Sequence, residues 1–88
     1  MAKSKATAET LRQFSSTLKK NHEDILAVKQ SMDNELQSFL WEDPVGAAFR
    51  AKYYEDLKPI KSKLLPNLVS YSEYLDHEAA IINEYGGE

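Results

Sequence analysis

The chain has 88 residues, with 11 lysines and arginines against 14 aspartates and glutamates, a net charge of -3 and no cysteine. The negative charge argues against general nucleic-acid binding, which needs a basic face, and the lack of cysteine excludes a disulfide framework and a thiolate metal site. No apolar run reaches the length of a signal-peptide core near the N-terminus or of a membrane span anywhere. We therefore expect one domain, 1-88, with no cleavable secretion signal and no membrane insertion.

Residues 7-40 are expected to form one helix, because no Gly or Pro interrupts them. Ser4 or Thr7 is suited to cap its start. Apolar residues follow the three-four spacing of a heptad helix, with Asn21 and Glu35 filling two gaps in the pattern. This stripe, which we interpret as the packing seam of the helix, consists of Leu11, Phe14, Leu18, Ile25, Val28, Met32 and Phe39.

The chain is expected to reverse over residues 41-43. Asp43 is a favoured N-cap residue and Pro44 suits the first helical position, where no amide hydrogen is needed. A second helix therefore begins at Pro44, and the short connection predicts a helical hairpin. Trp41 could cover the small residues that start at Gly46 and hold the turn, or it could simply fill the core at the end of a helix bundle.

The second helix is expected over residues 44-85, with Gly86 and Gly87 ending it. Its apolar residues recur with an eleven-residue repeat, and paired apolar residues such as Leu64-Leu65 widen the stripe beyond what one neighbouring helix covers. A single hairpin also has little interior. We therefore predict an all-α fold in which two antiparallel hairpins form a four-helix bundle dimer. The expected dimer interface comprises Tyr53, Leu57, Ile60, Leu64, Leu68, Tyr71, Leu75 and Ile82.

Pro59 and Pro66 interrupt the second helix, because a proline inside a helix removes one hydrogen bond and costs about 3 kcal/mol. The apolar stripe passes both prolines without changing phase, so we expect the helix to bend near them. The alternative is a third, short helix that begins at Pro59 after a stop at Leu57.

Charge is distributed unevenly along the chain. The first twenty residues are basic, and residues 67-88 carry acids but no Lys or Arg. These segments lie side by side in an antiparallel hairpin, so the asymmetry supports the turn at Trp41. A basic tail that binds acidic lipid or nucleic acid is the competing interpretation.

Residues that could carry out chemistry are few. His22 and His77 lack a second ligand at metal-binding spacing, and the chain has no cysteine nucleophile, no phosphate-binding loop and no convergent carboxylate pair. We expect no enzymatic activity, no catalytic residue, no cofactor and no metal site. All five tyrosines lie in the second helix, where their rings suit either core packing or a partner-docking surface.

A Trp in a tight interhelical turn, here Trp41, followed by a small residue (Gly46) and by Phe49, resembles the WXG family of small helical hairpins of the early-secreted-antigen type. Asp43 stands where that family has its glycine, which suggests a divergent member. The resemblance implies a homodimer or a heterodimer with a related hairpin, and folded export through a type VII or similar secretion system, with a secretion ATPase or effector as a further partner. It also implies an export signal of the form Tyr-x-x-x-Asp/Glu. Tyr74 and Glu78 have that spacing, whereas Tyr85 has the better position.

Two functional hypotheses follow. The first is a WXG-like protein that dimerises and serves as substrate, escort or adaptor of a type VII-like secretion system, so that it leaves the cytoplasm without a cleavable signal peptide. The alternative is a cytoplasmic helical-hairpin adaptor or regulator, for example a toxin-neutralising or scaffold protein, in which Trp41 is only structural.

Overall fold

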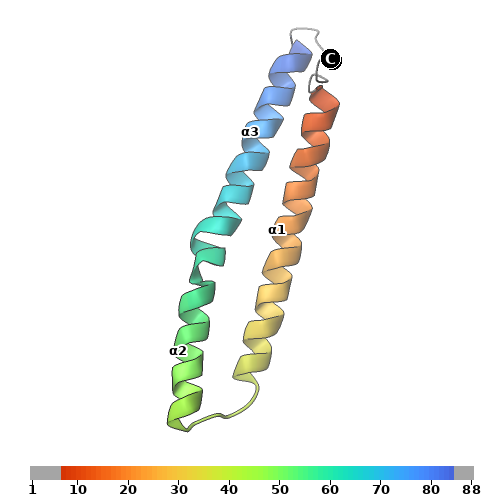
Figure 1. Ribbon diagram of the computed structural model, residues 1–88. Coiled ribbons are helices and arrows are strands. Elements are labelled where there is room, and N and C mark those ends of the chain that lie inside the picture. The colour runs from red at the N-terminus through yellow and green to blue at the C-terminus, as the bar shows by residue number, and fades with distance from the viewer. Residues whose placement is uncertain (1–6, 85–88) are drawn as a thin grey trace, which may run out of the picture.

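The computed structural model describes residues 7-84 and shows an all-helical antiparallel hairpin (Figure 1). The first arm is α1 (Ala8–Gln37), and the second arm contains α2 (Pro44–Pro59), a π-helical turn η1 (Ile60–Leu64) and α3 (Leu65–Glu84). The molecule measures 64 × 24 × 21 Å, so it is a rod with little interior. The last residue of the expected second helix, Tyr85, lies outside the described residues.

Helix α1 begins with a capping box. The Thr7 side chain accepts a hydrogen bond from the Thr10 amide at 3.1 Å, and the Thr10 hydroxyl accepts one from the Thr7 amide at 2.9 Å. The helix ends at Gln37, three residues before the expected end. Ser38 closes the last turn there, because its amide and its hydroxyl both donate to the Glu35 carbonyl, at 3.1 and 2.7 Å. Such bonds satisfy carbonyls that a helix end leaves free, and the connection consequently runs from Ser38 to Asp43.

Helix α2 begins as the sequence predicts. The Asp43 carboxylate accepts a hydrogen bond from the Gly46 amide at 2.8 Å, and Pro44 occupies the first turn. Because proline needs no donor there and aspartate satisfies an unpaired amide, these two residues fix the start of the helix.

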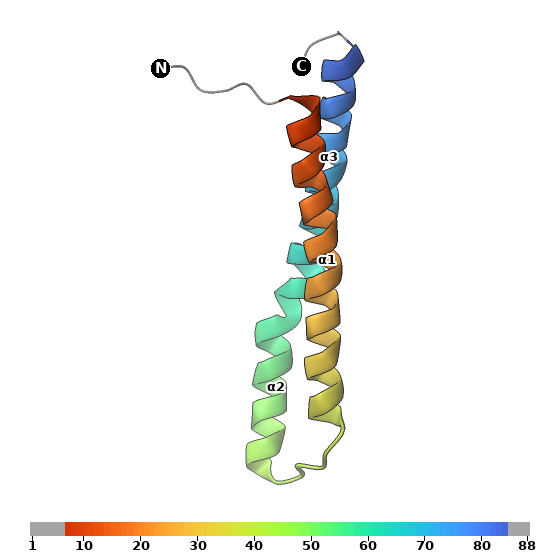
Figure 2. The same cartoon turned by 90° about the vertical axis from the view of Figure 1, so that its right-hand side faces the viewer.

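The second arm remains helical through both prolines, but it changes its hydrogen-bond pattern between them. The Leu65 amide donates to the carbonyl of Ile60, five residues earlier, where an α-helix would reach back four. The arm steps sideways at this π turn (Figure 2). Neither the third helix starting at Pro59 nor a simple bend of an α-helix describes this arrangement. A wide turn containing one additional residue separates α2 from α3.

The two arms pack most closely where α1 meets α3, through small side chains. Ser15 and Ser72 are only 1% and 2% exposed, and the Ser15 hydroxyl donates to the Ser72 carbonyl at 3.1 Å. Ala8 and Ala79, one heptad further along each helix, are also buried. Small residues let the two helix backbones approach each other closely. In contrast, no Cα atom of α2 comes within 8 Å of one in α1.

The expected seam of the first helix is only partly right, since Leu11, Leu18 and Ile25 are half-buried and the other four residues are exposed. The buried positions of α1 recur every seven residues but include polar side chains: Ala8, Ser15, Lys29 and Leu36. Of the apolar stripe, Phe14, Val28, Met32 and Phe39 are exposed. The stripe lies beside the contact with the second arm, because the narrow α1–α3 contact has no room for large side chains.

Candidate interaction surface

Two apolar grooves follow one side of the hairpin. The upper groove, with a volume of about 370 Å³, lies between α1 and α3 and is lined by Phe14, Leu18, Leu68, Tyr71, Tyr74 and Leu75. The lower groove, about 210 Å³, is lined by Asp24, Ile25, Val28, Lys29, Met32 and Ile60. Phe14 and Val28 are two heptads apart and therefore lie on the same side of α1. We call the apolar residues of the two grooves the apolar flank.

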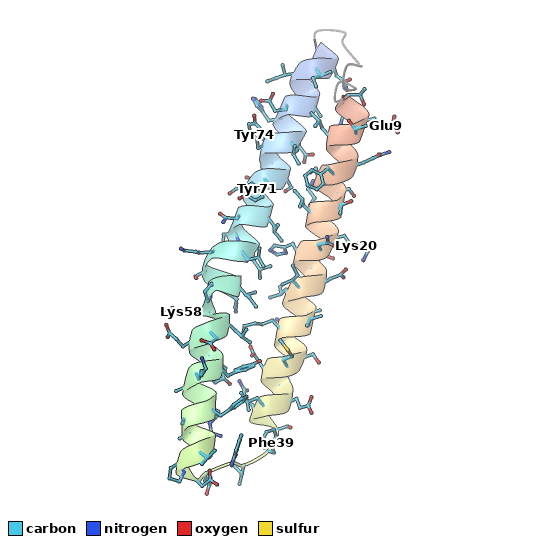
Figure 3. All side chains as sticks on the ribbon, viewed as in Figure 1. Glu9, Lys20, Phe39, Lys58, Tyr71 and Tyr74 are labelled. Carbon is cyan, nitrogen blue, oxygen red and sulfur yellow. The ribbon has the colours of Figure 1, made fainter. Side chains whose placement is uncertain are left out.

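The apolar flank is open to solvent. The side chains of Phe14, Val28 and Tyr74 are 55%, 58% and 63% exposed. Tyr71 and Tyr74 project from α3 one helical turn apart (Figure 3). Single exposed apolar side chains are ordinary in proteins, but two apolar grooves on the same side of a rod are typical of a binding surface.

The turn carries a cluster of aromatic rings. Trp41 packs on Phe49 with the ring centroids 5.7 Å apart, and Phe49 stacks on Tyr53 at 6.0 Å. Gly46 is buried beneath Trp41, since a Cβ atom built on this glycine would meet the Trp41 carbonyl oxygen and would lie 2.5 Å from Trp41 Cγ. The indole therefore covers the first turn of α2. Close by, Leu40 and Val45 are exposed, so the turn has an apolar outer surface as well.

A polar network connects α1 to α2, where the arms are farther apart. The Lys29 ammonium lies 2.6 Å from the Asp33 carboxylate, which also accepts a hydrogen bond from the Tyr53 hydroxyl at 2.8 Å. Hydrogen bonds from Lys29 and Tyr53 lower the pKa of Asp33. Desolvation, followed by the hydrogen bond to Asp33, raises the pKa of Tyr53 to about 12. Lys29 and Tyr53 thus occupy seam positions that aliphatic residues would usually take.

The residues expected at a dimer interface are divided between the contact within the hairpin and the open surface. Most are half-buried by the other arm: Tyr53, Leu57, Ile60, Leu68, Leu75 and Ile82. Leu64 and Tyr71 are exposed, whereas their neighbours Leu65 and Ser72 are buried. The π turn accounts for these two positions, because its additional residue places Leu65 on the inward side, and Ser72 follows seven residues later.

Of the residues expected in an export signal, the structure describes Tyr74 and Glu78 but not Tyr85. Tyr74 and Glu78 lie inside α3, with Tyr74 exposed and Glu78 half-buried. Tyr85 lies outside the described residues. The oppositely charged ends of the arms do meet, since Lys19 on α1 forms a 2.9 Å ion pair with Asp76 on α3.

Sequence reasoning missed two parts of this surface. The sequence pattern places Phe14, Val28 and Met32 in the packing seam of the first helix, although the same heptad spacing is also the signal of an apolar flank. The Lys29–Asp33–Tyr53 network gave no signal in hydropathy. Only the four-residue spacing of Lys29 and Asp33, which suits an ion pair on a helix, pointed to it.

Within residues 7-84, no group of three His, Asp or Glu side chains is placed to hold a metal ion. None of the helices described is long and apolar enough to cross a membrane. Comparisons of the chain with models of known protein families, with curated proteins and with solved structures found no match.

Proposed function

We propose that this protein is a non-enzymatic helical hairpin that works by association. Its apolar flank is covered by a second hairpin, either another copy or a related chain, and the pair forms a four-helix bundle. The observation that carries the proposal is the exposure of Phe14, Val28 and Tyr74 along two grooves on one side of the rod. Removing such side chains from water is worth about 25 cal/mol per Å² of apolar surface, which favours association.

The setting that we propose is a type VII-like secretion system, with the dimer as substrate, escort or adaptor. This part of the proposal rests on the resemblance of the turn to the WXG family. One residue separates the Trp from the Gly in the family's motif, whereas four residues separate Trp41 from Gly46 here. In support of the resemblance, Trp41 nevertheless packs directly over Gly46, so a Trp and a small residue come together in the turn. A secretion ATPase or an effector would be the next partner of the dimer.

The second candidate is a cytoplasmic adaptor or regulator that is never exported. One observation favours it: Tyr74 and Glu78 lie within the regular helix α3, where residues of this spacing are ordinary surface positions. The association through the apolar flank would be the same in both cases.

Sedimentation velocity at micromolar concentration tests the association. The wild type is expected to sediment as a dimer, and Phe14→Gln/Val28→Gln as a monomer. The matched control is Gln13→Ala/Gln30→Ala, which changes two exposed polar positions on the same helix. A monomeric wild type that also fails to bind a co-encoded hairpin would contradict the proposal.

Export is tested separately, in a host with a type VII-like system. The wild type is expected in the culture supernatant and Trp41→Ala inside the cells, with a cytoplasmic marker excluding lysis. If the wild type dimerises but neither protein leaves the cell, the adaptor function replaces the secretion function.

A further inference from the structure

The lysines of the described chain fall into two groups. Four of them form ion pairs of 2.6 to 2.9 Å with an aspartate: Lys19, Lys20, Lys29 and Lys52. The side chains of the other three of residues 7-84 have neither a hydrogen-bond nor an ion-pair partner there, and all lie within six residues at the π turn: Lys58, Lys61 and Lys63. The unpaired cations are therefore concentrated at one place on the rod.

Nearby acids offset this positive charge only in part: Glu55 lies three residues before Lys58, and the charge of Lys61 acts on Asp33. Residues 57-72 contain no Asp or Glu. The acid on the facing helix, Asp33, already binds Lys29 and Tyr53. Lys58 and Lys61 are three residues apart, so they are neighbours on the helix surface and repel each other. A chain with a net charge of -3 thus carries a local positive patch, which an anionic partner would stabilise.

Two of these lysines line a groove with an apolar floor. The groove has a volume of about 540 Å³ and is lined by Lys29, Tyr54, Leu57, Lys58, Lys61 and Ser62. The Tyr54 ring is held edge-on against Tyr53 at 5.1 Å, and its side chain remains 38% exposed. Lys58 projects outward from α2 (Figure 3). The groove therefore offers two ammonium groups beside a phenol ring and a leucine.

We propose that this basic groove binds an acidic segment of a partner protein, with two carboxylates at Lys58 and Lys61 and an aliphatic side chain against Leu57 and Tyr54. The apolar floor favours a peptide over a free inorganic anion, which could not use it. The groove contains no arginine and the chain is acidic, which disfavours nucleic acid. Two lysines also form too small a cationic area for stable attachment to an anionic lipid surface.

This site adjoins the lower apolar groove at Lys29, which lines both, but none of its other lining residues belongs to the apolar flank. Ile60 lines the lower apolar groove and Lys61 lines the basic groove. Successive helical residues point about 100° apart, so the two surfaces open in different directions. A dimer formed through the apolar flank would leave the basic groove available, and the proposal holds whether or not the protein is exported.

The test is binding of a fluorescein-labelled helical peptide in which two glutamates one turn apart flank a leucine on an alanine-glutamine background, measured by fluorescence anisotropy. The full-length wild type is expected to bind it, more weakly as salt rises. Lys58→Gln/Lys61→Gln should weaken binding by roughly tenfold or more, as loss of two charge pairs does. Lys20→Gln/Lys52→Gln, which removes the same charge elsewhere, should not. Circular dichroism checks that both variants remain folded.

The peptide with glutamines in place of its glutamates should not bind. Equal weakening by the two double variants would reduce the effect to overall charge and overturn the proposal. No binding of the acidic peptide would overturn it too, as would tighter binding of phosphatidylserine vesicles or single-stranded RNA through Lys58 and Lys61.

Discussion

Gly46 contacts Trp41 at the start of α2, and this contact leaves no room for a side chain at position 46. An alanine inside a helix is ordinarily more favourable than a glycine, by about 1 kcal/mol. Here the added Cβ would lie 2.5 Å from Trp41 Cγ and closer still to the Trp41 carbonyl oxygen, so both the indole and the backbone at Trp41 have to move. We expect Gly46→Ala to lower the free energy of unfolding by about 1–3 kcal/mol, as overpacking does, and to shift the emission of the only Trp toward longer wavelengths.

A double-mutant cycle isolates the cause of that loss. In a Trp41→Ala background the indole is gone but the backbone carbonyl oxygen at that position still lies in the way, so Gly46→Ala should cost less stability than in the wild type without becoming stabilising, in urea unfolding followed by circular dichroism. Gly46→Ala that is as stable as the wild type would show that Trp41 does not need the glycine.

Tyr53 gives the molecule a measurable response to alkaline pH. Its pKa is raised to about 12 from an ordinary 10.0, so the folded state favours the neutral phenol. The resulting stabilisation is fully present below pH 10.0 and is lost as the pH rises toward 12. Phenolate absorbance should show one tyrosine that ionises well after the others, and Tyr53→Phe should remove that step. Asp33→Asn should lower the pKa of Tyr53 toward its ordinary value, because the hydrogen bond and the negative charge of Asp33 both raise it. A late ionisation that survives Tyr53→Phe would show that another tyrosine is responsible.

At the scale of the helices, the inward positions of the second arm form two heptad runs. Gly46, Tyr53 and Ile60 are seven residues apart, and after a step of five residues the spacing resumes with Leu65, Ser72 and Ala79. A continuous α-helix cannot keep both runs on one side, because a five-residue step carries one residue too many. The π turn accommodates that residue, since its hydrogen bonds span five residues.

Deleting Ser62 should therefore damage the hairpin while making the helix more regular. Without the additional residue α2 rotates by about 100° relative to α3, which turns Tyr53 away from Asp33. We expect circular dichroism to show unchanged helicity, urea unfolding to show lower stability, and the late tyrosine ionisation to disappear. Ser62→Ala keeps the residue count and should behave like the wild type. A deletion variant that retains the late ionisation would show that the π turn does not set the register.

The sequence predicts where a helix begins better than it predicts which face of the helix is buried. Asp43 and Pro44 act through local rules, so the start of α2 and the hairpin were predictable. The inward face of α1 was not, because Ser15 and Lys29 are buried through contacts with α3 and α2 that hydropathy does not report. The eleven-residue spacing assumed a regular helix and therefore placed Leu64 inside, where the π turn places Leu65.

At the scale of the whole molecule, the rod separates the residues that hold it together from those that are most apolar. Its closest helix contact uses alanine and serine, while Phe14, Val28, Tyr71 and Tyr74 remain on the outside. Small buried side chains contribute little hydrophobic stabilisation, since this scales with the apolar area removed from water. The isolated hairpin should therefore be marginal, and covering the apolar flank should supply much of the stability of the folded protein.

This dependence predicts that thermal stability varies with protein concentration. A partner that binds only the folded state raises the unfolding midpoint by mass action. For the wild type, a hundredfold increase in concentration should raise Tm by several degrees, because about 1 kcal/mol shifts the midpoint of a domain of this size by 4–8 °C. Phe14→Gln/Val28→Gln should unfold at a lower Tm that no longer depends on concentration, and Gln13→Ala/Gln30→Ala should follow the wild type. If the wild type unfolds at the same temperature at every concentration, and adding a related hairpin does not raise it, the apolar flank is not what a partner chain covers.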